Sequence, residues 1–62
     1  MVPIRALRKA KGLRQTDLAQ AVGVSQPVIT KLERGERKPS VKVAKRIAAV
    51  LEFDWTDFFK ET

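Results

Sequence analysis

The stretch Gln15–Arg34, QTDLAQAVGVSQPVITKLER, decides the fold of this chain. It holds two short runs with the spacing of an amphipathic helix, and Gly23 lies between them. The apolar residues of each run fall on one helical face: Leu18, Ala19 and Val22 in the first, Ile29 and Leu32 in the second. Glycine favours a sharp change of direction because it adopts backbone conformations that other residues avoid. The stretch therefore predicts two short helices joined by a tight turn.

The residues between these apolar positions are small or polar: Gln15, Gln20, Ser25, Gln26, Thr30 and Lys31. Two helices with this layout are typical of a helix-turn-helix, here over about residues 15–34, in which the first helix supports the second. The second helix then offers a polar face that can lie in the major groove of DNA. We expect the rest of the chain to hold this pair in place.

The size and composition of the chain exclude several classes of protein. Its 62 residues correspond to one small domain, which we expect to span residues 1–62. The absence of cysteine and histidine excludes disulfide bonds and ordinary zinc sites, so no metal or other cofactor is expected. No apolar run approaches the roughly 18 residues that span a membrane, and no signal peptide is visible. The expected location is the cytoplasm, in association with the nucleoid.

The charge of the chain is strongly positive. Thirteen lysines and arginines stand against seven aspartates and glutamates, which gives a net charge of +6. On so small a domain this charge favours a polyanionic partner such as nucleic acid. Charge alone leaves a second interpretation open, in which the basic residues serve only solubility.

Helix start and stop signals divide the chain into five helices and show no strand pattern. Each glycine follows the expected end of a helix, where a left-handed residue can close it. Ser25, Ser40 and Asp54 are suitable N-caps for the last three helices. The helices are expected near residues 3–11, near 15–22, from Gln26 to about Arg34, over Val41–Leu51, and in a last short segment after Asp54. The predicted fold class is all-α.

At this point the sequence resembles the phage repressor/Cro-like (XRE-type) helix-turn-helix family. The resemblance covers nearly the whole chain and is carried by LRKAKGL, Q-x-x-LA, GVS, I-x-x-LE-x-G and KPS, followed by VAKRIAAVL and DWTDFF. It implies a compact five-helix, lambda-repressor-like domain in which the second and third helices form the helix-turn-helix. It also implies a sequence-specific regulator of transcription, a repressor, that reads double-stranded DNA.

Four residues at the start of the third helix are expected to contact bases: Gln26, Pro27, Thr30 and Lys31. The Gln26 amide can donate and accept at once, which matches the N6 and N7 edge of adenine. Pro27 either packs on a thymine methyl group or only initiates the helix. Lys31 reaches either guanine or a phosphate, and Thr30 lies one turn from Gln26 on the same face.

Six residues are expected to contact DNA phosphates: Arg14, Gln15, Arg37, Lys38, Ser40 and Lys42. Gln15 begins a helix whose free N–H groups attract anions, and the family's glutamine at this position contacts the backbone. Arg14 departs from the family, which usually has Thr, Ser or Asn as the cap. A cation there is unfavourable unless a phosphate lies beside it, although neutral drift explains it equally well.

The family resemblance also implies a pair formed by Arg8 and Glu33, which would fix the angle of the reading helix. The alternative is two solvated charges. One such module covers half of a typical operator, so a homodimer on a palindromic site is expected, with half-sites roughly 34 Å apart. The segment Glu52–Phe59 either supplies dimer contacts or places all its aromatic residues in the core, which is the expectation for Phe58, and dimerisation is either weak or induced by DNA.

Other function classes fit less well. The chain has no histidine, cysteine or tyrosine for catalysis, so it is not expected to be an enzyme and no small-molecule ligand is evident. The same fold also serves protein-interaction modules of the antitoxin or anti-repressor type, which is the alternative function. Binding of single-stranded RNA is disfavoured because no aromatic residue lies among the basic ones.

Overall fold

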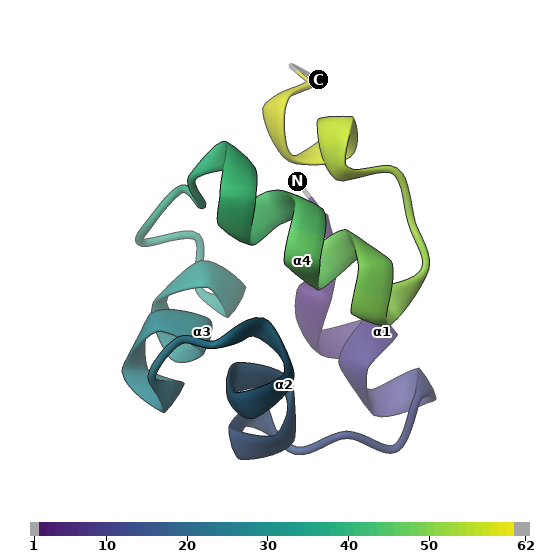
Figure 1. The fold of residues 1–62 in the computed structure, drawn as a ribbon, viewed down its shortest axis with the longest axis vertical. Coiled ribbons are helices and arrows are strands. Elements are labelled where there is room, and N and C mark those ends of the chain that lie inside the picture. The colour runs from purple at the N-terminus through teal and green to yellow at the C-terminus, as the bar shows by residue number, and fades with distance from the viewer. Residues whose placement is uncertain (1, 61–62) are drawn as a thin grey trace.

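The computed structural model describes residues 2–60, which form four α-helices and one 3-10 helix (Figure 1). The elements in chain order are α1 (Ile4–Ala10), α2 (Gln15–Val22), α3 (Gln26–Glu33), α4 (Val41–Leu51) and η1 (Trp55–Phe59). No strand occurs in this range, which confirms the all-helical prediction. Within the same range no helix is long and apolar enough to cross a membrane.

The prediction of five α-helices is wrong, because the last element is a 3-10 helix. The Asp54 carboxylate accepts a hydrogen bond from the backbone N–H of Thr56 at 3.0 Å, as expected for an N-cap. The Asp54 carbonyl accepts from the N–H of Asp57, also at 3.0 Å, and this i to i+3 bond belongs to the tighter helix. The segment is only five residues long, so its backbone forms the short turns of a 3-10 helix and not a series of i to i+4 hydrogen bonds.

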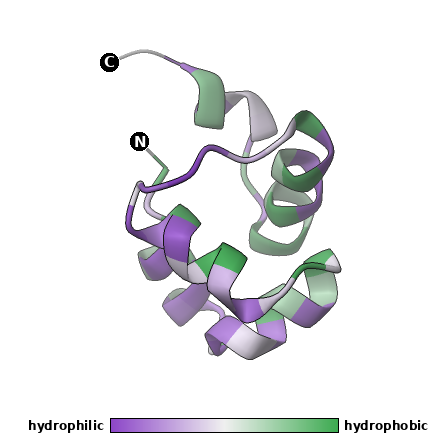
Figure 2. Ribbon diagram, turned by 90° about the vertical axis from the view of Figure 1, so that its left-hand side faces the viewer, coloured by the Kyte–Doolittle hydropathy of each residue, from purple (hydrophilic) through white to green (hydrophobic). Residues whose placement is uncertain are grey.

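The core lies between α4 and the other helices. α4 packs against α2 and η1, while α3 packs against α2 and α1. The largest fully buried side chains come from three helices: Leu18 and Val22 of α2, Ile29 of α3 and Ile47 of α4. Each contributes roughly 1.5–3 kcal/mol by leaving water. Figure 2 shows that hydrophilic residues follow the loop that joins α3 to α4, outside this core.

A left-handed glycine sets the angle between α2 and α3. Gly23 has φ +84°, and its N–H donates to the carbonyl of Ala19 at 2.8 Å. The next N–H, of Val24, bonds to the same carbonyl at 3.0 Å and closes the helix end. Arg46 of α4 adds a contact that no sequence pattern suggests, because its Nη1 donates to the carbonyl of Val22 at 3.1 Å. The turn is therefore held both by its own backbone and by α4.

Glu52 ends α4 in the left-handed conformation, with φ 60°. It is the one residue other than glycine with positive φ between residues 2 and 60. Its carboxylate forms an ion pair with Lys11, which follows α1. Beyond it the four aromatic residues pack in two edge-to-face pairs, Phe53 with Phe58 and Trp55 with Phe59.

Candidate nucleic-acid interface

The amphipathic pattern of α3 determines which of its residues face solvent. Ile29 and Leu32 are buried against the core, so the opposite side of the helix is free. Gln26, Pro27 and Lys31, three of the four residues predicted to contact bases, are exposed on that side. The fourth, Thr30, is half-buried. The exposed side of α3 is thus polar and carries one positive charge.

The start of α3 differs in one detail from a usual capped helix. Ser25 occupies the N-cap position as predicted, but its hydroxyl accepts no backbone hydrogen bond. Pro27 has no N–H to offer, and the N–H of Val28 bonds to the Ser25 carbonyl at 3.1 Å. The serine side chain is left on the surface beside Gln26.

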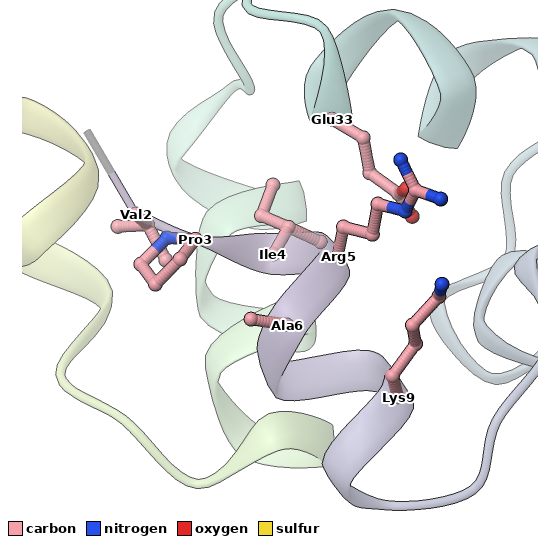
Figure 3. A pocket seen from close by; sticks show the side chains of 7 residues that line it. All are labelled: Val2, Pro3, Ile4, Arg5, Ala6, Lys9 and Glu33. Atoms are coloured by element: carbon pink, nitrogen blue, oxygen red, sulfur yellow. The ribbon is translucent and has the colours of Figure 1, made fainter.

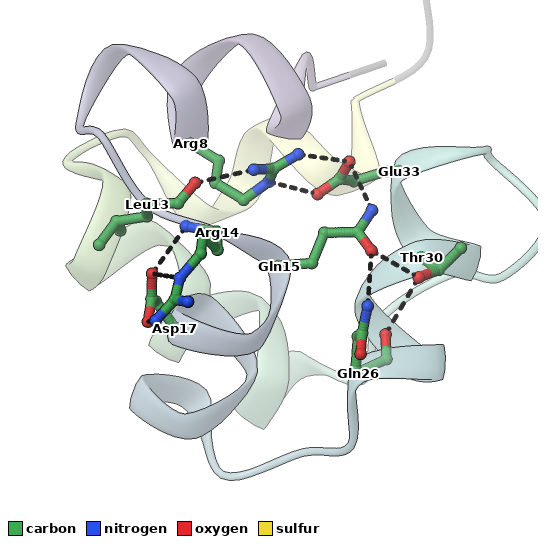
Figure 4. A network of polar contacts seen from close by, with 8 residues as sticks. All are labelled: Arg8, Leu13, Arg14, Gln15, Asp17, Gln26, Thr30 and Glu33. Carbon is green, nitrogen blue, oxygen red and sulfur yellow. Dashed lines mark hydrogen bonds and ion pairs between the residues drawn. The ribbon is translucent and has the colours of Figure 1, made fainter.

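Five polar side chains from α1, α2 and α3 form a connected group, here called the Gln15 cluster: Arg8, Gln15, Gln26, Thr30 and Glu33 (Figure 4). The Gln15 Oε1 accepts hydrogen bonds from Thr30 Oγ1 at 2.9 Å and from Gln26 Nε2 at 3.3 Å. The Gln15 Nε2 donates to Glu33 Oε1 at 3.2 Å. A residue predicted to contact phosphate therefore lies in direct contact with two residues predicted to contact bases.

Arg8 and Glu33, expected to pair, are joined by two hydrogen bonds. The Arg8 Nε donates to Glu33 Oε2 at 2.8 Å, and Nη2 donates to Oε1 at 3.3 Å. Their side chains are only 9% and 5% exposed. The Arg8 Nη1 also donates to the carbonyl of Leu13 at 2.7 Å, so the guanidinium ties α1 and the following loop to α3. The bidentate geometry is the strong form of this interaction.

Arg14 is held by an acid on its own helix. Asp17 Oδ2 accepts from the Arg14 backbone N–H at 2.8 Å and from Arg14 Nε at 3.1 Å. The hydrogen bond from the Arg14 side chain lowers the pKa of Asp17, and the same bond raises the pKa of Arg14. The Arg14 side chain is 82% exposed, so its outer edge remains accessible to a phosphate.

The polar residues that follow α3 lie on the surface beside a groove lined by both basic and apolar side chains. Arg37, Lys38, Ser40 and Lys42 are all exposed. The Ser40 Oγ accepts from the N–H of Val43 at 3.2 Å, which caps α4 and leaves the hydroxyl proton available as a donor. Arg37 and Lys38 line the groove, of about 550 Å³, together with Phe58 and Phe59.

Two arginines that no sequence pattern singles out lie next to the Gln15 cluster. Arg5 of α1 and Arg34, at the end of α3, line a polar hollow of about 340 Å³ that also contains Gln15 and Thr30. Spacing along the chain could not indicate this site, because it depends on how α1 docks against α3. The hollow brings positive charge from two helices to the edge of the reading surface.

A further pocket of about 530 Å³ lies along α1 and shares Arg5 and Glu33 with the polar hollow (Figure 3). Its lining is mostly apolar, with Arg5 and Lys9 extending from the same side of the helix. Glu33 is the one lining residue that belongs to the predicted site. Within residues 2–60 there is no cluster of three acidic side chains that could hold a metal ion.

Comparisons with known proteins show which family and which solved structures this chain is similar to. A family model described as Helix-turn-helix (HTH_3) matches residues 4–58. An uncharacterized HTH-type transcriptional regulator of Bacillus subtilis, YqaF, is 44% identical over 54 residues, which cover 87% of this chain and 71% of that protein. The ImmF control region 10 kDa protein of Bacillus phage phi105 is 39% identical over 51 residues, covering 82% of this chain and 57% of that protein.

Among solved structures, the N-terminal DNA binding domain of SinR from Bacillus subtilis superposes with a TM-score of 0.80 at 28% identity, covering 95% of this chain and 87% of that domain. An HTH_3 family transcriptional regulator from Vibrio cholerae superposes with a TM-score of 0.74 at 37% identity. The chain spans 32% of the Vibrio protein, so the similarity there is confined to one part of a longer molecule.

Proposed function

The chain belongs to the HTH_3 helix-turn-helix family, and from this premise we propose that it is a sequence-specific repressor of transcription that reads the major groove with α3 as a homodimer. The family is one of DNA-binding transcriptional regulators and not of enzymes. Membership confirms the resemblance to XRE-type regulators, among whose relatives is a phage control-region protein. The alternative is a protein-interaction module with the same fold.

The observation that carries the proposal is the exposure of Gln26 at the outer start of α3. Gln26 and Lys31 are both exposed, whereas Ile29 and Leu32 of the same helix are buried in the core. In the proposal Gln26 contacts adenine, Lys31 contacts guanine or phosphate, and Pro27 packs on a thymine methyl group. Thr30 lies between them on the same face and completes the predicted base-contacting set.

Positive charge on both sides of α3 supports the proposed grip on the DNA backbone. On one side are Gln15, the exposed edge of Arg14, and the hollow lined by Arg5 and Arg34. On the other side are the exposed residues of the loop and the start of α4: Arg37, Lys38, Ser40 and Lys42. These contacts would set the register of α3 without reading sequence.

Two exposed apolar side chains support the proposed homodimer. Val41 at the start of α4 is 50% exposed and Phe59 at the end of η1 is 45% exposed. Phe59 belongs to the segment expected to supply dimer contacts. Burial of these side chains between two protomers would contribute to association, and two reading helices would then face two half-sites.

Selection of bound duplexes from a random DNA pool tests the proposed function. We expect enrichment of one sequence with two related half-sites, and loss of that sequence preference in Gln26→Ala. The matched control is Gln20→Ala, since Gln20 is an exposed glutamine on α2 outside the Gln15 cluster. Enrichment by Gln20→Ala and not by Gln26→Ala supports base reading. No enrichment by the unaltered chain would favour the protein-interaction module.

A further inference from the structure

The Gln15 amide lies at the centre of a chain of hydrogen bonds between a buried ion pair and the reading face of α3 (Figure 4). Its nitrogen donates to Glu33 at 3.2 Å. Its oxygen has two lone pairs, which accept from Thr30 at 2.9 Å and from Gln26 at 3.3 Å. Three of the four hydrogen-bonding positions of this amide are therefore used within the protein.

The charge of Glu33 determines which way the Gln15 amide faces. An ionised carboxylate can only accept hydrogen bonds, so the donor end of Gln15 must point toward it. The reverse orientation would place the Gln15 oxygen against the Glu33 carboxylate, with two acceptors and no proton between them. Arg8 holds that carboxylate in place through two hydrogen bonds at 2.8 and 3.3 Å.

The orientation of Gln15 in turn determines what Gln26 can offer to a base. Because the Gln15 oxygen faces α3, Gln26 donates one Nε2 hydrogen to it. One N–H and the Oε1 acceptor of Gln26 remain, which is the pattern that adenine matches with N7 and its N6 amino group. With Gln15 reversed, Gln26 would turn its oxygen inward and leave two N–H donors, the pattern that guanine matches with N7 and O6.

We propose that Glu33 and Thr30 are positioning residues for base recognition: acting through the Gln15 amide, they make Gln26 select adenine over guanine. Glu33 sets the polarity of the chain of hydrogen bonds. Thr30 steadies it, since its hydroxyl lies within hydrogen-bonding distance of the Gln15 oxygen and of the Gln26 carbonyl, at 2.9 and 3.3 Å. The inference rests on the proposed function and gives Thr30 an indirect role in place of a base contact.

The experiment compares two duplexes that carry the operator selected by the unaltered chain. They differ only at the position where Gln26→Ala relaxes the preference, with A·T in one and G·C in the other. The measurement is the ratio of the two dissociation constants. A bidentate amide–adenine contact gives roughly 10- to 100-fold discrimination, and we expect Glu33→Gln and Thr30→Val each to reduce it about threefold or more.

Two features of the design separate positioning from direct contact and from loss of fold. In a Gln26→Ala background, neither substitution should change the ratio further, since both act through Gln26. Glu36→Gln and Thr16→Val are matched controls, because both residues are exposed and lie outside the Gln15 cluster, and they should leave the ratio unchanged. Where Glu33→Gln fails to fold, Thr30→Val decides.

Each outcome has a distinct meaning. A reduced ratio that depends on Gln26 supports the inference. An unchanged ratio in Thr30→Val and in folded Glu33→Gln overturns it and leaves the proposed function intact. A reduction of the ratio that also occurs in the Gln26→Ala background overturns the inference as well, because Glu33 or Thr30 would then contact DNA without acting through Gln26. Failure of the unaltered chain to prefer any duplex overturns the proposed function and this inference together.

Discussion

Arg14 is an unfavourable residue at the start of a helix, and the structure shows how its cost is offset. The sequence suggested two explanations, a neighbouring phosphate or neutral drift. The carboxylate of Asp17 instead accepts hydrogen bonds from both the backbone N–H and the side chain of Arg14. An acid in the first turn also suits the positive end of the helix dipole. One carboxylate thus compensates for the missing cap before any DNA is bound.

The hydrogen bonds of the acidic side chains predict how stability depends on pH. The pKa of Asp17 is lowered by hydrogen bonding from Arg14, that of Glu52 by Lys11, and that of Asp54 by Thr56. A lowered pKa stabilises the fold above the usual carboxyl pKa, and that contribution is lost as the pH falls through the folded-state value. We expect the melting temperature to decline below about pH 4.

Asp17→Asn checks the contribution of this residue. Asparagine keeps a carbonyl acceptor but loses the charge, so melting curves between pH 2 and pH 7 should decline less steeply in the variant. Parallel declines in the two proteins would contradict the assignment. The effect is small, because the pair with Arg14 is largely solvated.

Glu33→Gln should lower the free energy of unfolding by about 2 kcal/mol or more, because it leaves the Arg8 charge buried without its partner. Urea denaturation measures the change. Glu36→Gln is the matched control, since Glu36 pairs with Arg34 at 3.8 Å and both side chains are exposed. That substitution should change stability by no more than about 0.5 kcal/mol. Equal losses of unfolding free energy in the two variants would show that the buried pair of Arg8 and Glu33 stabilises the fold no more than an exposed pair does.

At the scale of the elements, the turn between α2 and α3 depends on Gly23 and on a neighbour from α4. An added Cβ at Gly23 would lie 3.3 Å from Arg46 Nη1, the atom that bonds to the carbonyl of Val22. The left-handed backbone alone costs a non-glycine residue about 1 kcal/mol. The turn therefore couples a backbone requirement to a side-chain contact.

Gly23→Ala should accordingly be more destabilising than Gly12→Ala. Gly12 has a similar φ of +70°, but nothing lies within 4 Å of its added Cβ. Gly12→Ala is expected to cost about 1 kcal/mol and Gly23→Ala about 2 kcal/mol, since it also disturbs Arg46. Thermal or urea unfolding measures the difference. A Gly12 variant as unstable as the Gly23 variant would exclude a role for Arg46.

Capping residues and hydrophobic spacing predict where the helices lie, but they do not predict contacts between residues that are far apart in the sequence. Ser40 and Asp54 accept the capping bonds that their positions suggested. The prediction of a fifth α-helix after Asp54 is wrong, because the sequence pattern of five residues does not distinguish the i to i+3 hydrogen bonds of a 3-10 helix from the i to i+4 bonds of an α-helix. The bonds from Thr30 to Gln15 and from Arg46 to Val22 join residues 15 and 24 positions apart, and no periodicity encodes such contacts.

At the scale of the whole molecule, positive charge is spread over a small body. The principal extents are 28 × 20 × 19 Å, and the chain carries a net charge of +6. Phosphate contacts displace counterions, so DNA affinity should fall steeply as salt rises. Replacing both Arg37 and Lys38 by glutamine should flatten the slope of log K against log salt by about 2 for each protomer bound.

Titrations of fluorescent duplex at several salt concentrations measure that slope. Lys45→Gln is the control, because its ammonium lies 5.0 Å from the Trp55 ring centre and is not among the predicted phosphate contacts. It removes one positive charge and should leave the slope nearly unchanged. A flattening by Lys45→Gln about half as large as that of the double variant, in proportion to the charges removed, would mean that net charge, and not the loop after α3, governs the salt dependence.

The left-handed torsion at Glu52 has a consequence for how this molecule tolerates change. Since α4 ends at Glu52, the backbone conformation of this one residue sets the direction of the aromatic segment that follows it, and the ion pair with Lys11 connects Glu52 to the end of α1. Insertion of a residue into the last turn of α4 would rotate the segment after α4 by about 100° about the helix axis. The four aromatic rings would then lose their packing against α4. Variation in the length of this fold is therefore better accommodated in the polar loop before α4 than at its end.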